Sequence, residues 1–148
     1  MARILLATDG SDLATHAAKT ATELFGPAHD YTAIVVVPPP PAAVPVGEAG
    51  VAPMVDPAVS EEQTAALAHE AEVVLQLVDD ATAVPLRPKV VHGDPGRTIC
   101  EVARDFDVVV VASHGTGFFK RLLIGSVSNH VLHHAPCPVF VVREKNQD

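Results

Sequence analysis

The chain of 148 residues is long enough for one domain with a single core and too short for a catalytic domain beside a separate partner domain. Hydrophobic residues make up 48% and aromatic residues 4%, so the core must be built from Val, Ile, Leu and Ala, which favours an α/β fold. The net charge of −8 argues against sequence-independent binding to nucleic acid, which needs many cationic side chains against the phosphates.

The beginning of the chain and its cysteines indicate a compartment. The first ten residues, MARILLATDG, hold only a short apolar run that ends before Asp9. We therefore expect neither a signal peptide nor a membrane span at this end of the chain. The protein is expected to be cytosolic. Cys100 and Cys137 have no CxxC spacing, which favours reduced thiols over a disulfide framework.

The first third of the chain predicts strand, helix and strand. Residues 3–8 form a short apolar run, and Ser11 stands where an N-cap opens a helix over 12–25, which Gly26-Pro27 ends. Residues 31–37, YTAIVVV, are rich in β-branched residues and predict the second strand. The apolar positions at helical spacing in the helix are Leu13, Ala17, Ala21, Leu24 and Phe25.

A long loop and a second helix follow. Residues 38–57 are dense in Pro, Ala and Gly without a period and predict a mobile surface loop, either a tolerated insertion or a lid. The next helix begins at Asp56-Pro57 or at Ser60 and runs to about Asp79. Its expected apolar face includes Leu67, Ala71, Val74 and Val78.

The last part of the chain predicts three more strands and two helices. Residues 84–91 form a strand whose prolines indicate a sheet edge, and Asp94-Pro95 opens a helix. Residues 107–112, DVVVVA, are apolar on both faces and predict a central strand. Ser126 is expected to cap a helix that Pro136 ends, and residues 138–143, PVFVVR, predict the fifth strand.

This alternation predicts one Rossmann-like α/β domain over residues 1–148. Its five-stranded parallel sheet has the order 3-2-1-4-5, with helices on both faces. Ligands of such folds bind beyond the carboxyl ends of the strands, where the strand order reverses. The loops DGSD and SHGTGFFKRLLIGS, after the first and fourth strands, are therefore expected to face each other.

The second of these loops has the properties of a phosphate site. Glycines let backbone amides approach an anion, and a helix N-terminus adds free N–H groups. Gly115, Gly125 and Ser126 fit this description, with the amides of Ser126 and Val127 and the Ser126 hydroxyl aimed at one anion. An ordinary glycine-containing loop with an N-cap serine explains the same residues, and the local pattern leaves both interpretations open.

Three charged side chains in the two loops also have two interpretations each. Lys120 and Arg121 either contact phosphate or form a solvated cationic pair. Asp9 either binds a hydroxyl or base edge of a ligand or satisfies the backbone of its own turn.

Other motifs fail. The GxGxxG spacing begun by Gly115 and Gly117 has Lys120 at its last position, and no GxxxxGK[ST] occurs, which excludes a standard NAD-binding domain and a P-loop. His130 and His134 stand four apart like metal ligands, but no second cluster supports a zinc site. We expect these histidines to cover the surface or to favour the helix dipole.

The sequence TDGSD and the segment VVVVASHGTGFFKRLLIGSVSNHVLHHAPCPVFVVR resemble the universal stress protein family, and the resemblance covers essentially the whole chain. Nucleotide-binding members carry Gly-x-x-Gly, nine residues, and then Gly-Ser or Gly-Thr. Gly115 and Gly125-Ser126 match this pattern, whereas Ala112 stands at the first glycine.

The resemblance implies a set of binding residues. It places a triphosphate on Gly115, Gly125, Ser126 and the amides of Val127 and Ser128. It places Thr8 and Asp9 beside the adenosine and Val37 near the base.

The resemblance also implies a function: a stress-response regulatory protein that binds ATP or a related adenine nucleotide, with Mg²⁺, and forms a homodimer through residues 138–143. Ala112 favours an alternative, a nucleotide-free dimeric module whose partners are proteins. A slow ATPase is a further alternative, for which we assign no general base or metal-binding carboxylate beyond Asp9.

Overall fold

The computed structural model describes residues 1–39, 57–114 and 124–144. They form a five-stranded sheet with the order β3-β2-β1-β4-β5, in which every neighbouring pair is parallel. The predicted Rossmann-like α/β fold and strand order are therefore confirmed. The elements are β1 (Arg3–Ala7), α1 (Asp12–Phe25), β2 (Asp30–Val37), α2 (Pro57–Ala81), β3 (Arg87–His92), α3 (Pro95–Val102), the 3₁₀ helix η1 (Ala103–Asp105), β4 (Val108–Ala112), α4 (Ser126–His134) and β5 (Val139–Val142).

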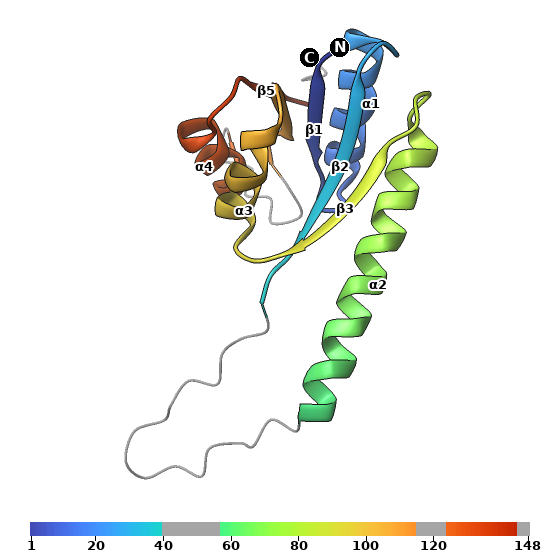
Figure 1. Ribbon diagram of the computed structural model, residues 1–148, viewed down its shortest axis with the longest axis vertical. Coiled ribbons are helices and arrows are strands. Elements are labelled where there is room, and N and C mark those ends of the chain that lie inside the picture. The colour runs from blue at the N-terminus through green and yellow to red at the C-terminus, as the bar shows by residue number, and fades with distance from the viewer. Residues whose placement is uncertain (40–56, 115–123, 145–148) are drawn as a thin grey trace.

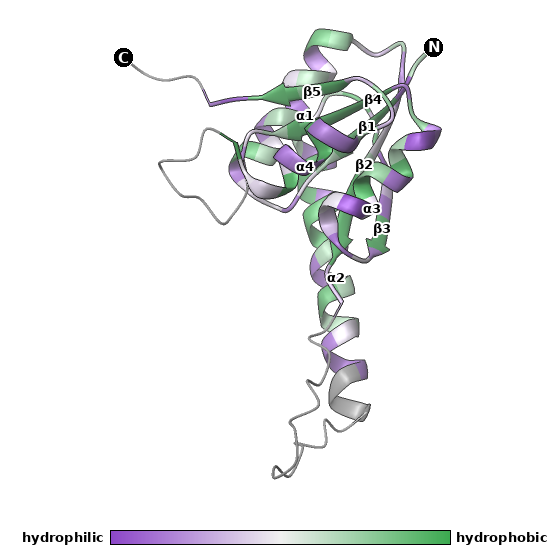
Figure 2. Cartoon of the chain, turned by 90° about the vertical axis from the view of Figure 1, so that its left-hand side faces the viewer, coloured by the Kyte–Doolittle hydropathy of each residue, from purple (hydrophilic) through white to green (hydrophobic). Residues whose placement is uncertain are grey.

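Helices cover both faces of the sheet, as Figure 1 shows: α1 and α2 lie on one side, α3 and α4 on the other. The two cores follow from the alternation of side chains along each strand. In β1, Ile4 and Leu6 join the cluster against α1, whereas Leu5 joins the cluster against α3 and α4. Figure 2 shows that the central strands are largely hydrophobic, whereas the helices carry both hydrophobic and hydrophilic residues.

Helix α1 lies on the sheet through small side chains. Ala14, Ala17, Ala18 and Ala21 are at most 3% exposed, which places the helix backbone close to the strands. Leu24, one of the apolar positions at helical spacing, lies to one side of the alanine stripe and is 66% exposed.

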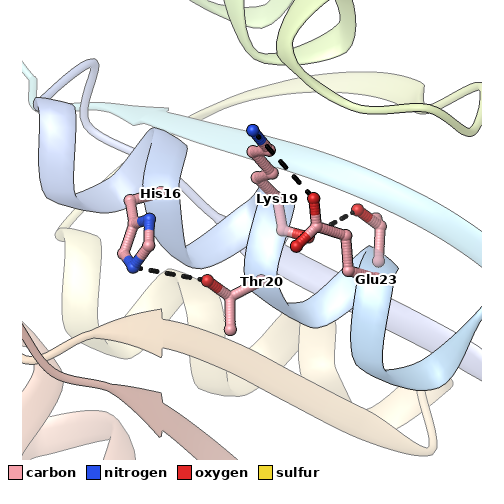
Figure 3. Close-up of polar contacts among 5 residues, drawn as sticks. His16, Lys19, Thr20 and Glu23 are labelled. Carbon is pink, nitrogen blue, oxygen red and sulfur yellow. Dashed lines mark hydrogen bonds and ion pairs between the residues drawn. The ribbon is translucent and has the colours of Figure 1, made fainter.

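The opposite face of α1 is polar, and Figure 3 shows its contacts. Lys19 Nζ lies 4.0 Å from Glu23 Oε1, and Thr20 Oγ1 lies 3.4 Å from His16 Nε2. Because these side chains are exposed, each pair contributes at most a few tenths of a kcal/mol to stability. This polar face of α1 is therefore solvated, and its side-chain contacts contribute little to the stability of the fold.

Helix α2 begins at Pro57, the first of the two predicted starts. Ala71, Leu75 and Val78 are buried, with Ala71 and Leu75 packed in a cluster with β2. The N-terminal part of α2 extends beyond the ends of the strands (Figure 1). For this reason the prediction that Leu67 lies on a buried face is wrong: Leu67 is 38% exposed.

Two of the predicted helix caps are confirmed. Ser11 Oγ accepts a hydrogen bond from Ala14 N at 3.2 Å, and Asp94 Oδ2 accepts one from Arg97 N at 3.1 Å. Each bond satisfies one of the amides that a helix leaves without an intrahelical acceptor.

Strand β3 lies at the sheet edge, as its prolines predicted. No helix in the described ranges has the length and apolar character needed to cross a bilayer.

Candidate functional site

The turn after β1 is held by its own polar side chains. Thr8 continues the sheet, since its amide donates to Ile34 O at 3.0 Å. Thr8 Oγ1 accepts from Gly10 N at 3.2 Å, and Asp9 Oδ1 accepts from Ser11 N at 3.0 Å. The second interpretation of Asp9, a carboxylate that satisfies its turn, is thus observed, and a role for the same carboxylate at a ligand stays a prediction.

Helix α4 begins differently from the prediction. Gly125, not Ser126, is the N-cap: Gly125 has extended φ and ψ of −70° and 161°, and its carbonyl accepts the first intrahelical bond, from Asn129 N at 2.8 Å. Its amide donates to Ser113 O at 2.5 Å. Because that bond fixes Gly125 outside the helix, Ser126 becomes the first helical residue and its hydroxyl caps nothing.

A second bond fixes α4 to the end of β4. Ser128 Oγ donates to Ala112 O at 2.5 Å, and both residues are buried, at 8% and 7% exposure. Gly125 also approaches the chain closely, since a Cβ added there would lie 3.2 Å from His114 Cα. The N-terminus of α4 is therefore held against the carboxyl end of β4.

This attachment presents amide groups at the edge of the sheet. The amides of Ser126, Val127 and Ser128 precede the first intrahelical bond, so they have no acceptor within the helix. Ser126 and Val127 are exposed. Together with the helix dipole, these amides give the site a partial positive charge that can attract an anion.

The sheet brings most of the predicted residues to one edge. The register between β1 and β4 pairs Leu6 with Val110, and extending it by two residues brings Thr8 level with Ala112. The strand order reverses between these two strands, where such folds place ligands. Val37 lies at the same edge at the end of β2, where its carbonyl accepts from Gly93 N at 3.0 Å.

Some predicted features lie outside the described residues: Gly115, the pair Lys120 and Arg121, and residues 40–56 of the predicted loop. The histidine pattern is described. His130 and His134 stack with ring centroids 4.3 Å apart, and no group of three or more His, Cys, Asp or Glu side chains among the described residues is placed to hold a metal ion.

Comparisons with known proteins agree on one family. The model of the universal stress protein family matches residues 1–143. A universal stress protein of Synechocystis sp. is 36% identical over 85 residues, covering 56% of this chain and 54% of the relative. The chain spans about half the length of the first curated relatives it matches, 54% and 48%. The structure of universal stress protein UspA from Lactobacillus plantarum superposes with a TM-score of 0.73 at 30% identity, covering 96% of this chain and 97% of that one.

Two more distant structures share the fold and contain ligands. A universal stress protein in complex with cAMP superposes with a TM-score of 0.60 at 20% identity, covering 96% of both chains. A universal stress protein family protein from Arabidopsis thaliana with AMP bound superposes with a TM-score of 0.61 at 17% identity, covering 99% of this chain and 94% of that one.

Proposed function

Because the chain belongs to the universal stress protein family, we propose that it is a stress-response regulatory protein that binds an adenine nucleotide between the ends of β1 and β4. The observation that carries the proposal is the attachment of α4, in which bonds from Gly125 and Ser128 hold three amides at that edge. These amides suit the phosphates, and the turn at Thr8 and Asp9 suits the adenosine.

Ala112 does not oppose this proposal as strongly as the sequence pattern alone indicates. A methyl group at a position where nucleotide-binding members have glycine would matter if it pointed at the phosphates. In the structure, Ala112 belongs to the cluster of Ile4, Leu6 and Val110 against α1. Its methyl group therefore packs in the core on the face of the sheet opposite to α4.

The ligands of two proteins of the same fold support an adenine base, but they do not indicate how many phosphates the ligand of this chain carries. Two proteins of the same fold carry AMP and cAMP. We propose ATP or a related adenine nucleotide for this chain, because the amides of residues 126–128 suit a phosphate group whichever adenine nucleotide carries it. Mg²⁺ would arrive with the nucleotide, whose phosphate oxygens are its usual ligands in such sites.

Calorimetric titration of ATP with Mg²⁺ into nucleotide-free protein tests the proposal. We expect micromolar binding that Ser126→Asp weakens by roughly tenfold or more, because a carboxylate beside the phosphates repels them. Asp is favourable in the first turn of a helix, so this variant should fold as well as the wild type.

Ala28→Asp is the matched control. It adds the same charge in the exposed turn between α1 and β2, at the opposite end of the sheet, and should leave the affinity unchanged. Absence of heat and of a thermal shift at millimolar ATP would support the nucleotide-free module instead.

We also propose a homodimer through β5. This strand lies at the sheet edge, and Val139, Phe140 and Val141 are only half-buried. An apolar edge strand invites pairing with a second chain. Light scattering after size exclusion should give twice the chain mass at micromolar concentration, and a monomeric mass would refute this assembly.

A further inference from the structure

A cleft of about 260 Å³ lies between α3 and α4, on the outer side of these helices. It shares no residue with the nucleotide site proposed above. Arg97, Cys100, Glu101, Arg104, His130, His134 and Pro136 line it.

The wall formed by α3 and η1 is cationic. Arg97 and Arg104 are seven residues apart and so lie on the same side, two helical turns from each other. Arg97 Nε lies 3.1 Å from Glu101 Oε1, and Arg97 makes no other ion pair with the described residues, so its two Nη groups can contact a ligand. Arg104 makes no ion pair within the part of the chain that the structure describes. Two guanidinium groups thus face one carboxylate, in a chain whose net charge is −8.

The wall formed by α4 is a pair of fixed imidazole rings. The rings of His130 and His134 stack at 4.3 Å with an interplanar angle of 20°. His134 Nδ1 lies 2.9 Å from His130 O, and since a carbonyl can only accept, Nδ1 carries the hydrogen. Nε2 of His134 therefore accepts a hydrogen bond when the imidazole is neutral and donates one only when the imidazole is protonated.

Gly96 fixes the position of the first ring. A Cβ added to Gly96 would lie 3.0 Å from His130 Cγ and Cδ2, so the ring packs against the bare backbone of α3. The His130 ring is therefore held in place before any ligand arrives, which reduces the entropy lost on binding.

We propose that this cleft binds a phosphate group, either free inorganic phosphate or the phosphate group of a small monoester. Guanidinium groups match the geometry of phosphate oxygens with paired N–H donors. Nε2 of His134 accepts from a protonated phosphate oxygen when the ring is neutral and donates to an ionised one when the ring is protonated. Pockets for drug-sized ligands measure about 300 to 1,000 Å³, so the smaller volume here suits one phosphate group with a short substituent.

The test is a titration of the ¹⁵N-labelled Ser126→Asp protein with inorganic phosphate, followed by NMR. The Ser126→Asp background suppresses phosphate binding at the N-terminus of α4. We expect saturable shifts of the amides of Arg97, Glu101, Arg104 and His130. Arg104→Gln in the same background should weaken binding by about tenfold, the usual loss for one charge-assisted contact.

Arg87→Gln is the matched control, because Arg87 is an exposed arginine of β3 at the sheet edge. It should change the affinity by less than about twofold. The proposal is overturned if no saturable shift occurs up to about 50 mM phosphate, or if both arginine variants weaken binding equally. A parallel titration with glycerol phosphate separates the two sources: tighter binding than inorganic phosphate indicates a monoester ligand, and equal or weaker binding indicates free phosphate.

Discussion

Two serines in the first turn of α4, two residues apart, should respond very differently to the same substitution. Ser128→Ala removes the 2.5 Å bond to Ala112 O and leaves a buried carbonyl without this donor. Loss of a partner for a buried polar group lowers the free energy of unfolding by about 1 to 3 kcal/mol. Ser126→Ala removes an exposed hydroxyl that caps nothing, and should change that free energy by less than about 0.5 kcal/mol.

Urea unfolding followed by circular dichroism measures both variants under the same conditions. The sequence pattern made Ser126 the N-cap, and loss of an N-cap serine typically lowers stability by about 1 kcal/mol. A loss of that size in Ser126→Ala, or equal losses in the two variants, would refute the attachment of α4 described above.

Three further predictions concern the core, the turns and the thiols. Tyr31→Phe removes the 2.6 Å bond to Gly26 O and should lower the free energy of unfolding by about 1 kcal/mol. Burial raises the pKa of Tyr31, so its contribution is complete below the unfolded value of about 10 and is lost as pH rises through the folded value; urea unfolding at increasing pH should show a smaller alkaline loss in Tyr31→Phe. Gly10→Ala should lower the melting temperature more than Gly26→Ala, because both have φ near +80° but only a Cβ at Gly10 meets α2, at 2.9 Å; equal melting temperatures would contradict this contact. Burial raises the pKa of Cys100 and Cys137, so iodoacetamide near pH 8 should modify them more slowly than in urea-unfolded protein, and equal rates would contradict their burial.

The helix and strand limits that local chemistry controls were predictable. Ser11 accepts from the first turn of α1, and Gly26 adopts a φ of 80° at its end, so the predicted range 12–25 matches the helix. Leu24 and Leu67 fit the apolar spacing of their helices but are exposed, because helical spacing does not tell where the covering sheet ends or on which side of a stripe a residue falls.

The location of the candidate site was predictable, but its construction was not. Strand order and loop glycines indicate the edge between β1 and β4. The contact between Ser128 and Ala112 joins residues sixteen apart and has no local signal. The direction of the Ala112 methyl group does have a local signal, because alternation along β4 puts this group on the same face as Val110.

Nucleotide binding at the N-terminus of α4 is the central claim, and an NMR titration of the ¹⁵N-labelled wild-type protein with ATP and Mg²⁺ tests it most directly. The largest amide shifts should occur at residues 126–128 and in the turn at Thr8–Ser11, and in Ser126→Asp they should saturate only at a roughly tenfold or more higher ATP concentration. Shifts confined to other parts of the chain, or none at millimolar ATP, would contradict the account.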